Sequence, residues 1–158
     1  MPVIKIEKIV KDIESIGYSK PGDAGIDLRA SGQWVVDIDS RKREIVQEEY
    51  ELMPGERILV KTGIRLEIPN GFWGNIRDRS GLAANHGIHC LAGVVDETYR
   101  GEIMVAIVNL GKNPYKLRKN ERVAQMIITP YVSAKISYEE TLTESERGAN
   151  GFGSSGKK

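Results

Sequence analysis

Short apolar stretches of strand length, each ended by turn-forming residues, recur along this chain and constrain its fold more than any other feature. Residues 64–68 alternate apolar and charged side chains and stop at Pro69-Asn70-Gly71, which is typical of a strand ended by a turn. Only residues 80–87 favour a short helix, with Ser80 as its N-cap and Gly87 as its C-terminal stop. The pattern predicts an all-β sandwich or barrel with one short helix.

The other predicted strands differ in their burial. Residues 3–10 favour an opening strand, and residues 24–30 favour a strand with Ile26 and Leu28 on one face and Asp27 on the other, solvated face. The charged stretch 34–50 favours a long exposed hairpin. The continuous apolar runs 105–108 and 123–128 predict strands that are buried on both faces.

Length and composition exclude several classes of protein. The 158 residues predict one domain over residues 1–143, followed by a flexible Gly/Ser-rich arm over residues 144–158. A net charge of +1 supplies no overall field for nucleic acid or for a membrane surface, and no apolar stretch approaches about 18 residues. The single cysteine, Cys90, excludes an internal disulfide. We therefore expect a soluble cytoplasmic protein that binds neither nucleic acid nor membrane.

The segment 92–102 contains the first candidate catalytic residue. Asp96 follows small and apolar residues and precedes a turn-like Glu97-Thr98-Tyr99, after which residues 103–108 are apolar. We expect Asp96 to lie at a hairpin between two strands, where a fixed carboxylate can act as a general base on a water molecule. A carboxylate that only caps its own turn is the alternative interpretation.

Two other places favour phosphate binding. At Arg79-Ser80-Gly81 a guanidinium, a hydroxyl and free backbone amides converge at the start of the short helix. Asp78 beside it has the wrong charge for such a site, although strand alternation points it away from the face of Arg77 and Arg79. In the C-terminal arm, Arg147 and Phe152 stand beside Gly and Ser residues that can wrap a nucleotide, and the alternative there is an idle tail.

Two further polar positions need partners. Gln125 is a polar residue in a predicted buried strand, so its amide must be hydrogen-bonded. His86, His89 and Cys90 are metal-ligand types, but a fourth ligand is missing and their spacing matches no standard zinc site.

Five short segments together resemble the five motifs of the trimeric dUTPase (deoxyuridine triphosphate nucleotidohydrolase) family, and they occur in the family's order. They are residues 24–28, residues 79–83, residues 93–101, residues 122–125 and residues 147–156. The resemblance implies a dUTPase-like β-jelly roll, or β-clip, in a homotrimer with three active sites at subunit interfaces. It also implies Mg²⁺-dependent hydrolysis of dUTP to dUMP and pyrophosphate, which limits uracil in DNA and supplies dUMP.

The resemblance assigns a role to each matching residue. Asp96 would activate the water that attacks the α-phosphorus, and Tyr99 would pack under the deoxyribose. The uracil edge would contact the backbone of Gly93, Val94, Val95 and Asp96, and also Met104. Phosphate oxygens would be held by Arg79, Ser80, Gly81 and Gln125. Asp27 would contact the metal only through water. The C-terminal arm would close over the nucleotide with Arg147, Phe152, Gly153, Ser154 and Ser155.

Other functions remain open at this point. A dCTP deaminase resembles this fold, but that family needs a catalytic glutamate on the strand after the third motif, where residues 103–107 contain no acid. A nucleotide-sensing relative could keep the pocket without turnover. A structural jelly roll without a ligand would leave Arg147 and Phe152 unexplained.

Overall fold

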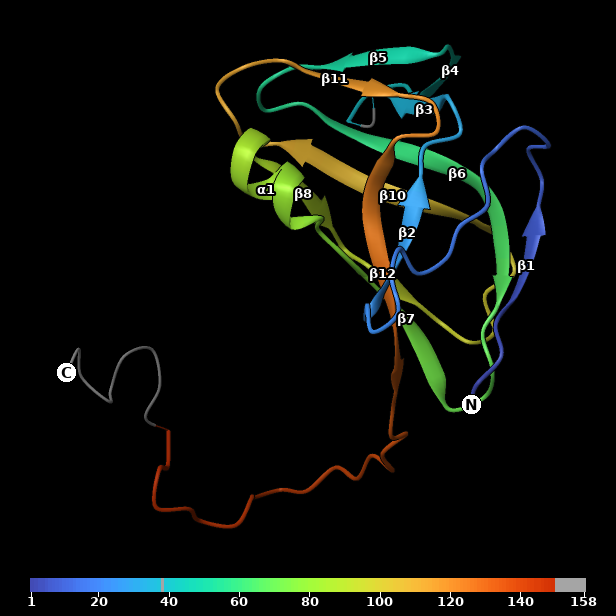
Figure 1. Cartoon of the computed structure of the whole chain (residues 1–158). Coiled ribbons are helices and arrows are strands. Elements are labelled where there is room, and N and C mark those ends of the chain that lie inside the picture. The colour runs from blue at the N-terminus through green and yellow to red at the C-terminus, as the bar shows by residue number, and fades with distance from the viewer. Residues whose placement is uncertain (38, 150–158) are drawn as a thin grey trace.

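The computed structural model describes residues 1–37 and 39–149, and within them it forms sheets that pack face to face, with a single helix at one side (Figure 1). One sheet has the order β4-β3-β6-β10-β8, with β1 also beside β6; the second has the order β2-β12-β7-β9; and β11 pairs with β5. All described pairings are antiparallel. The predicted all-β class with one short helix is confirmed.

The elements have the following bounds. They are β1 (Lys5–Lys8), β2 (Gly25–Arg29), β3 (Gln33–Val36), β4 (Arg43–Val46), β5 (Glu49–Leu52), β6 (Arg57–Glu67), β7 (Phe72–Arg77), α1 (Ser80–His86), β8 (Ile88–Leu91), β9 (Val94–Val95), β10 (Glu102–Asn109), β11 (Tyr115–Arg118) and β12 (Arg122–Pro130).

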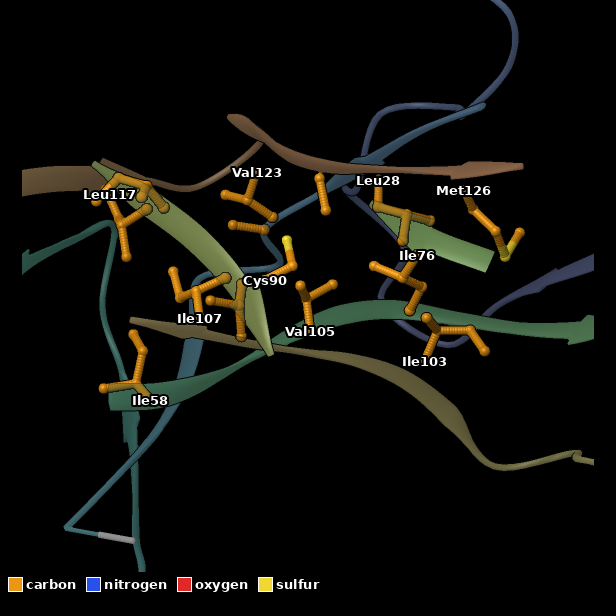
Figure 2. Packing of buried hydrophobic residues seen from close by; sticks show 14 of the residues in the cluster. Leu28, Ile58, Ile76, Cys90, Ile103, Val105, Ile107, Leu117, Val123 and Met126 are labelled. Atoms are coloured by element: carbon orange, nitrogen blue, oxygen red, sulfur yellow. The ribbon is translucent and has the colours of Figure 1, made fainter. Parts of the chain in front are cut away.

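The core lies between the two larger sheets. Figure 2 shows Ile103, Val105 and Ile107 of β10 pointing toward side chains from the opposite layer, such as Leu28 and Val123. Each of these residues is almost fully buried. Because burying one such side chain stabilises a fold by about 1.5–3 kcal/mol, this shared layer fixes the relative positions of the sheets that carry the polar residues described below.

The prediction of burial on both faces holds only in part, because residues 105–108 and 123–128 each include half-buried as well as buried side chains. On β10, buried Val105 and Ile107 alternate with half-buried Ala106 and Val108, and Met104 is exposed. An antiparallel sheet needs cover on one face only, so its outer face can carry apolar residues without burying them in the same chain.

Helix α1 begins one residue earlier than the sequence indicated. Arg79 occupies the N-cap position with extended backbone and no side-chain cap, and Ser80 is the first helical residue, so the assignment of Ser80 as N-cap was wrong. Gly87 ends the helix with left-handed backbone (φ 71°), as predicted, and its N–H donates to the Ala83 carbonyl. The pairing of β3 with β4 confirms a hairpin in residues 34–50, but the prediction that it is exposed was wrong for β3, where Trp34 and Val36 are buried.

The last strand ends at Pro130, and residues 131–149 form neither strand nor helix and run away from the sheets (Figure 1). Several large apolar side chains are exposed along this segment; they include Val132, Ile136, Tyr138 and Leu142. In the described ranges, no helix has the length and apolar character needed to cross a membrane.

Candidate functional site

A pocket of about 290 Å³ lies between the segment around β9 and strand β10. Its lining includes all six residues of the segment 93–104 for which the sequence predicted a role, namely Gly93, Val94, Val95, Asp96, Tyr99 and Met104. Apolar side chains of the core, among them Ile76 and Ile103, form its floor. The pocket is therefore mostly apolar, with backbone amides and one carboxylate at its edge.

A sharp bend at Ala92 and Gly93 shapes this pocket. Both residues have positive φ, 63° at Ala92 and 136° at Gly93. The Gly93 carbonyl accepts a hydrogen bond from the Ile76 N–H at 2.8 Å, and a Cβ on Gly93 would lie 2.6 Å from the Ile76 carbonyl oxygen. Only glycine fits there, because a side chain would be strained and would overlap β7.

Asp96 does not lie in a hairpin, so that prediction was wrong. Strand β9, which ends beside it, pairs with β7, whereas β10 pairs with β6 and β8. Asp96 therefore stands on the crossing from one sheet to the other. Its own backbone closes the following turn, since its carbonyl accepts the Tyr99 N–H at 3.1 Å. The Asp96 side chain is exposed at the pocket edge.

Hydrogen bonds hold the turn after Asp96 in place. The Glu97 carboxylate accepts the Gly71 N–H at 2.5 Å, and the Glu97 carbonyl accepts a hydrogen bond from Arg100 at 2.6 Å. The Tyr99 hydroxyl donates to the Glu102 carbonyl at 3.0 Å, and its ring lies so close to Gly101 that a Cβ there would be 2.3 Å from the hydroxyl oxygen. The Tyr99 ring is thus fixed, with one side open to the pocket.

A second group of polar residues gathers where β2, β12 and the end of β7 meet. Asp27 Oδ1 lies 3.1 Å from Arg79 Nε, and Asp27 Oδ2 lies 3.0 Å from Arg122 Nη1. The Asp27 side chain is only 16% exposed, so the expectation of a solvated carboxylate was wrong. Two guanidinium groups around one carboxylate leave a local excess of positive charge, which suits phosphate binding.

Gln125 belongs to the same group of polar residues, and its side-chain amide is hydrogen-bonded to the backbone of Asp78. Its Nε2 donates to the Asp78 carbonyl at 2.8 Å, so this half-buried amide has a hydrogen-bond partner, as the sequence required. The side chain crosses Gly25, where a Cβ would lie 2.3 Å from Oε1. Ser80 and Gly81 are exposed at the start of α1, directly after Arg79.

Arg122 was not among the predicted site residues. Besides Asp27, it contacts the Ser19 hydroxyl at 3.1 Å, and its carbonyl accepts from Arg79 Nη1 at 3.1 Å. Its position in the same short motif as Gln125 was the signal that could have identified it.

The two groups of residues lie toward opposite ends of β7. Val95 is paired with Gly74, and Asp96 continues from there away from Arg79. Arg79 lies five positions after Gly74, which corresponds to a backbone span of at most about 17 Å at about 3.3 Å per residue. Within this chain, Asp96 and Arg79 therefore extend from opposite ends of β7.

The remaining candidates lie elsewhere. Arg147 is exposed in the C-terminal segment, and Phe152, Gly153, Ser154 and Ser155 fall outside the described residues. The three residues considered for zinc have other neighbours: the His86 ring packs against the Tyr115 ring in a tilted arrangement, with 4.8 Å between centroids, while His89 and Cys90 contact Asp78. No group of metal-ligand side chains that could hold an ion occurs in residues 1–37 and 39–149.

An all-β chain with an apolar pocket, an exposed carboxylate and a separate arginine pair has the parts of a nucleotide-binding site. The sequence model of the dUTPase family matches residues 45–156. The chain belongs to the dUTPase family.

Named relatives support this membership. The chain is 44% identical over 146 residues to a deoxyuridine 5'-triphosphate nucleotidohydrolase of Rhizobium etli, a match that covers 91% of this chain and 86% of that protein. It is 40% identical over 163 residues to the protein of the same name from Anaeromyxobacter, with 99% of this chain and 100% of that protein covered.

Solved structures share the fold. The dUTPase of Staphylococcus bacteriophage 80alpha, solved with dUPNHPP, superposes with a TM-score of 0.81 over 98% of each chain at 24% identity. The dUTPase of phage phi11 of S. aureus superposes with a TM-score of 0.73 over 89% of this chain and 97% of that one, at 17% identity.

Proposed function

We propose that this protein hydrolyses dUTP to dUMP and pyrophosphate, and so limits uracil incorporation into DNA and supplies dUMP. The observation that carries the proposal is the pocket at whose edge Asp96 is exposed, because its lining contains Asp96 and Tyr99 together with the motif residues 93–95. The names of the relatives, at 40–44% identity over most of the chain, support the same activity.

The pocket suits a uracil base and a deoxyribose. The backbone of residues 93–96 is positioned by the Gly93 bend and can present amide and carbonyl groups to a pyrimidine edge. The fixed Tyr99 ring offers a flat apolar surface for the sugar, and a ring packed against the sugar leaves no room for a 2′-hydroxyl.

Asp96 would take a proton from the water that attacks the α-phosphorus, and the pyrophosphate would leave on the opposite side. Arg79, Ser80, Gly81 and Gln125 would hold the phosphate oxygens. In this arrangement the chain's own residues orient the phosphates and the water, and the water's proton moves to an Asp96 carboxylate oxygen.

Mg²⁺ fits this site as an ion that arrives on the triphosphate. Asp27 is held by two arginines, so it is better placed to contact the water shell of the ion than to ligate it directly. Bound in that way, Mg²⁺ would neutralise charge on the phosphates during the reaction.

The separation along β7 supports a homotrimer with shared sites. The α-phosphate and the phosphates beyond it are joined by single bridging oxygens, so the base that activates water and the groups that hold the phosphates must lie close together, whereas Asp96 and Arg79 extend from opposite ends of β7. A second subunit can supply Arg79 next to the first subunit's Asp96. A third could supply the C-terminal arm with Arg147, Phe152, Gly153, Ser154 and Ser155 as a cover that excludes water. With its only cysteine unpaired and buried, the enzyme would act in the reducing cytoplasm.

Incubation of the pure protein with dUTP, dCTP, dTTP or UTP and Mg²⁺ tests the reaction. We expect dUMP and pyrophosphate from dUTP, and far less turnover of the other three nucleotides. Ammonia and dUTP from dCTP would identify a deaminase instead. Tight dUTP binding without product would identify a sensing relative.

Mixed trimers test the shared site. Asp96→Asn and Arg79→Ala subunits should each be almost inactive alone. If each site takes Asp96 from one subunit and Arg79 from the next, random mixing in equal amounts restores both groups in about a quarter of the sites. A site built within one subunit would regain no activity after mixing.

A further inference from the structure

Asp78 is an acid inside the phosphate-binding segment, between Arg77 and Arg79, and the proposed reaction gives it no role. The structure explains how this carboxylate is tolerated there. Its Oδ1 accepts the Cys90 N–H at 2.6 Å, and its Oδ2 accepts from His89 Nδ1 at 2.8 Å. The Asp78 carboxylate is thus turned toward β8, away from Arg79 and Arg122, the two arginines that contact Asp27.

These contacts keep the carboxylate ionised. Burial opposes ionisation, but the hydrogen bonds from His89 and Cys90 together hold the pKa of Asp78 below its usual value. The same residue faces the site through its backbone, because its carbonyl accepts the Gln125 amide at 2.8 Å. Asp78 therefore links β8, through its carboxylate, to the Gln125 side chain on β12, through its carbonyl.

Side chains of two residues hold the chain where β7 passes into α1: Arg79, which contacts Asp27 and the Arg122 carbonyl, and Asp78, which contacts β8. Arg79, the N-cap of α1, makes no side-chain cap hydrogen bond, and Ser80 and Gly81 are exposed. On the β8 side, the path of the backbone from β7 into α1 is held by Asp78, the residue just before Arg79, through two hydrogen bonds. A movement of Asp78 would displace both the following guanidinium and the amide of Gln125.

We propose that Asp78, supported by His89, is a positioning residue that holds Arg79 and Gln125 in place for the β- and γ-phosphates of the nucleotide. This inference rests on the proposed hydrolysis of dUTP. It assigns Asp78 to the phosphate end of the substrate only, since the pocket for the base is lined by other residues on β9 and β10.

The test compares two inhibitors of dUTP hydrolysis: dUPNHPP, which carries the whole triphosphate chain, and dUMP, which lacks the β- and γ-phosphates. For Asp78→Ala we expect the inhibition constant of dUPNHPP to rise about tenfold, in line with the loss of a charged hydrogen bond, and that of dUMP to stay unchanged. Asp78→Asn keeps an oxygen for the Cys90 N–H and should recover most of the dUPNHPP affinity. His89→Ala removes one exposed partner and should show a smaller change in the same direction, even if Asp78→Ala does not fold.

Glu56→Ala is a matched control. The Glu56 carboxylate also accepts one backbone N–H, from Met53 at 2.8 Å, and one aromatic side-chain hydrogen bond, from Tyr50, but it lies in another turn. It should lower the melting temperature without changing either inhibition constant. Equal weakening of both inhibitors in Asp78→Ala, or no change in either with Asp78→Ala and His89→Ala, overturns the positioning role. A wild-type protein that does not hydrolyse dUTP overturns the proposed function itself.

Discussion

Gly81 offers a substitution that should move stability and activity in opposite directions. It is the second residue of α1, its φ is not in the left-handed region, and a Cβ built on it would meet nothing within 4 Å. The fold therefore gives no reason for glycine at this position. Replacing a helical glycine by alanine reduces the entropy of the unfolded chain, so Gly81→Ala should stabilise the subunit by about 0.5–1 kcal/mol. For a domain of this size that raises the melting temperature by about 1–4 °C.

The same methyl group should harm catalysis. If phosphate oxygens approach the exposed backbone at Ser80 and Gly81, an added Cβ displaces them, and kcat/KM for dUTP should fall by about tenfold or more. Thermal denaturation and pyrophosphate release, measured on the same preparation at one protein concentration, check the expected rise in melting temperature and the expected fall in kcat/KM. A Gly81→Ala enzyme with full activity would refute the close approach of phosphate to this backbone.

Gly93→Ala is the contrasting control, because glycine there is required by the fold. The residue has φ 136°, and its Cβ would lie 2.6 Å from the Ile76 carbonyl oxygen. Backbone strain of about 1–3 kcal/mol and the overlap with β7 should together cost about 3 kcal/mol of unfolding free energy. Comparison of the two variants distinguishes Gly93, where the fold requires glycine, from Gly81, where a side chain would obstruct the approach of the ligand.

Four further predictions concern catalysis and the buried thiol. Asp96→Asn should keep dUPNHPP binding while turnover falls by about a hundredfold or more, and unchanged turnover would remove Asp96 from the reaction. Tyr99→Ala should increase UTP hydrolysis relative to dUTP, so unaltered selectivity would mean that the 2′-position is recognised elsewhere. Removal of residues 144–158 should leave the assembly intact but abolish most hydrolysis, which size-exclusion chromatography and product assays can show. Burial, followed by the adjacent Asp78 carboxylate, raises the pKa of the Cys90 thiol to about 12, so at pH 8 it should react with a disulfide reagent on the order of a thousandfold more slowly than in unfolded protein. The pKa of the Cys90 thiol is higher in the folded protein than in the unfolded chain. The stability that depends on keeping this thiol protonated is therefore complete below about pH 9 and is lost as the pH rises toward 12.

Local patterns in the sequence predicted most elements of the fold. Turn residues and alternation identified the strands, and Gly87 ended the helix as its freedom at positive φ requires. The residues around Asp96 to which the family resemblance assigned roles line one pocket, because they are close in the chain and the Gly93 bend brings them together.

Strand pairing was the part that local patterns could not supply. Val94–Val95 and Glu102–Asn109 follow one another as the strands of a hairpin would, yet they enter different sheets. The choice is made by distant residues such as Ile76, whose N–H binds the Gly93 carbonyl. Asp27 was misjudged for the same reason, since its partners Arg79 and Arg122 come from elements far along the chain.

Strand β7 is the element on which both halves of the proposed site depend. Near the start of β7, Gly74 pairs with Val95, which precedes Asp96. Beyond the end of β7, Asp78 and Arg79 contact Gln125 and Asp27, the residues proposed for the phosphate end of the site. It lies between β12 and β9 and is hydrogen-bonded on both sides, which makes it a stiff support. In a trimer with shared sites, the two ends of one β7 serve two different active sites. A substitution that shifts β7 therefore disturbs two neighbouring sites at once, whereas a change confined to the Asp96 carboxylate disturbs only the site to which that side chain belongs.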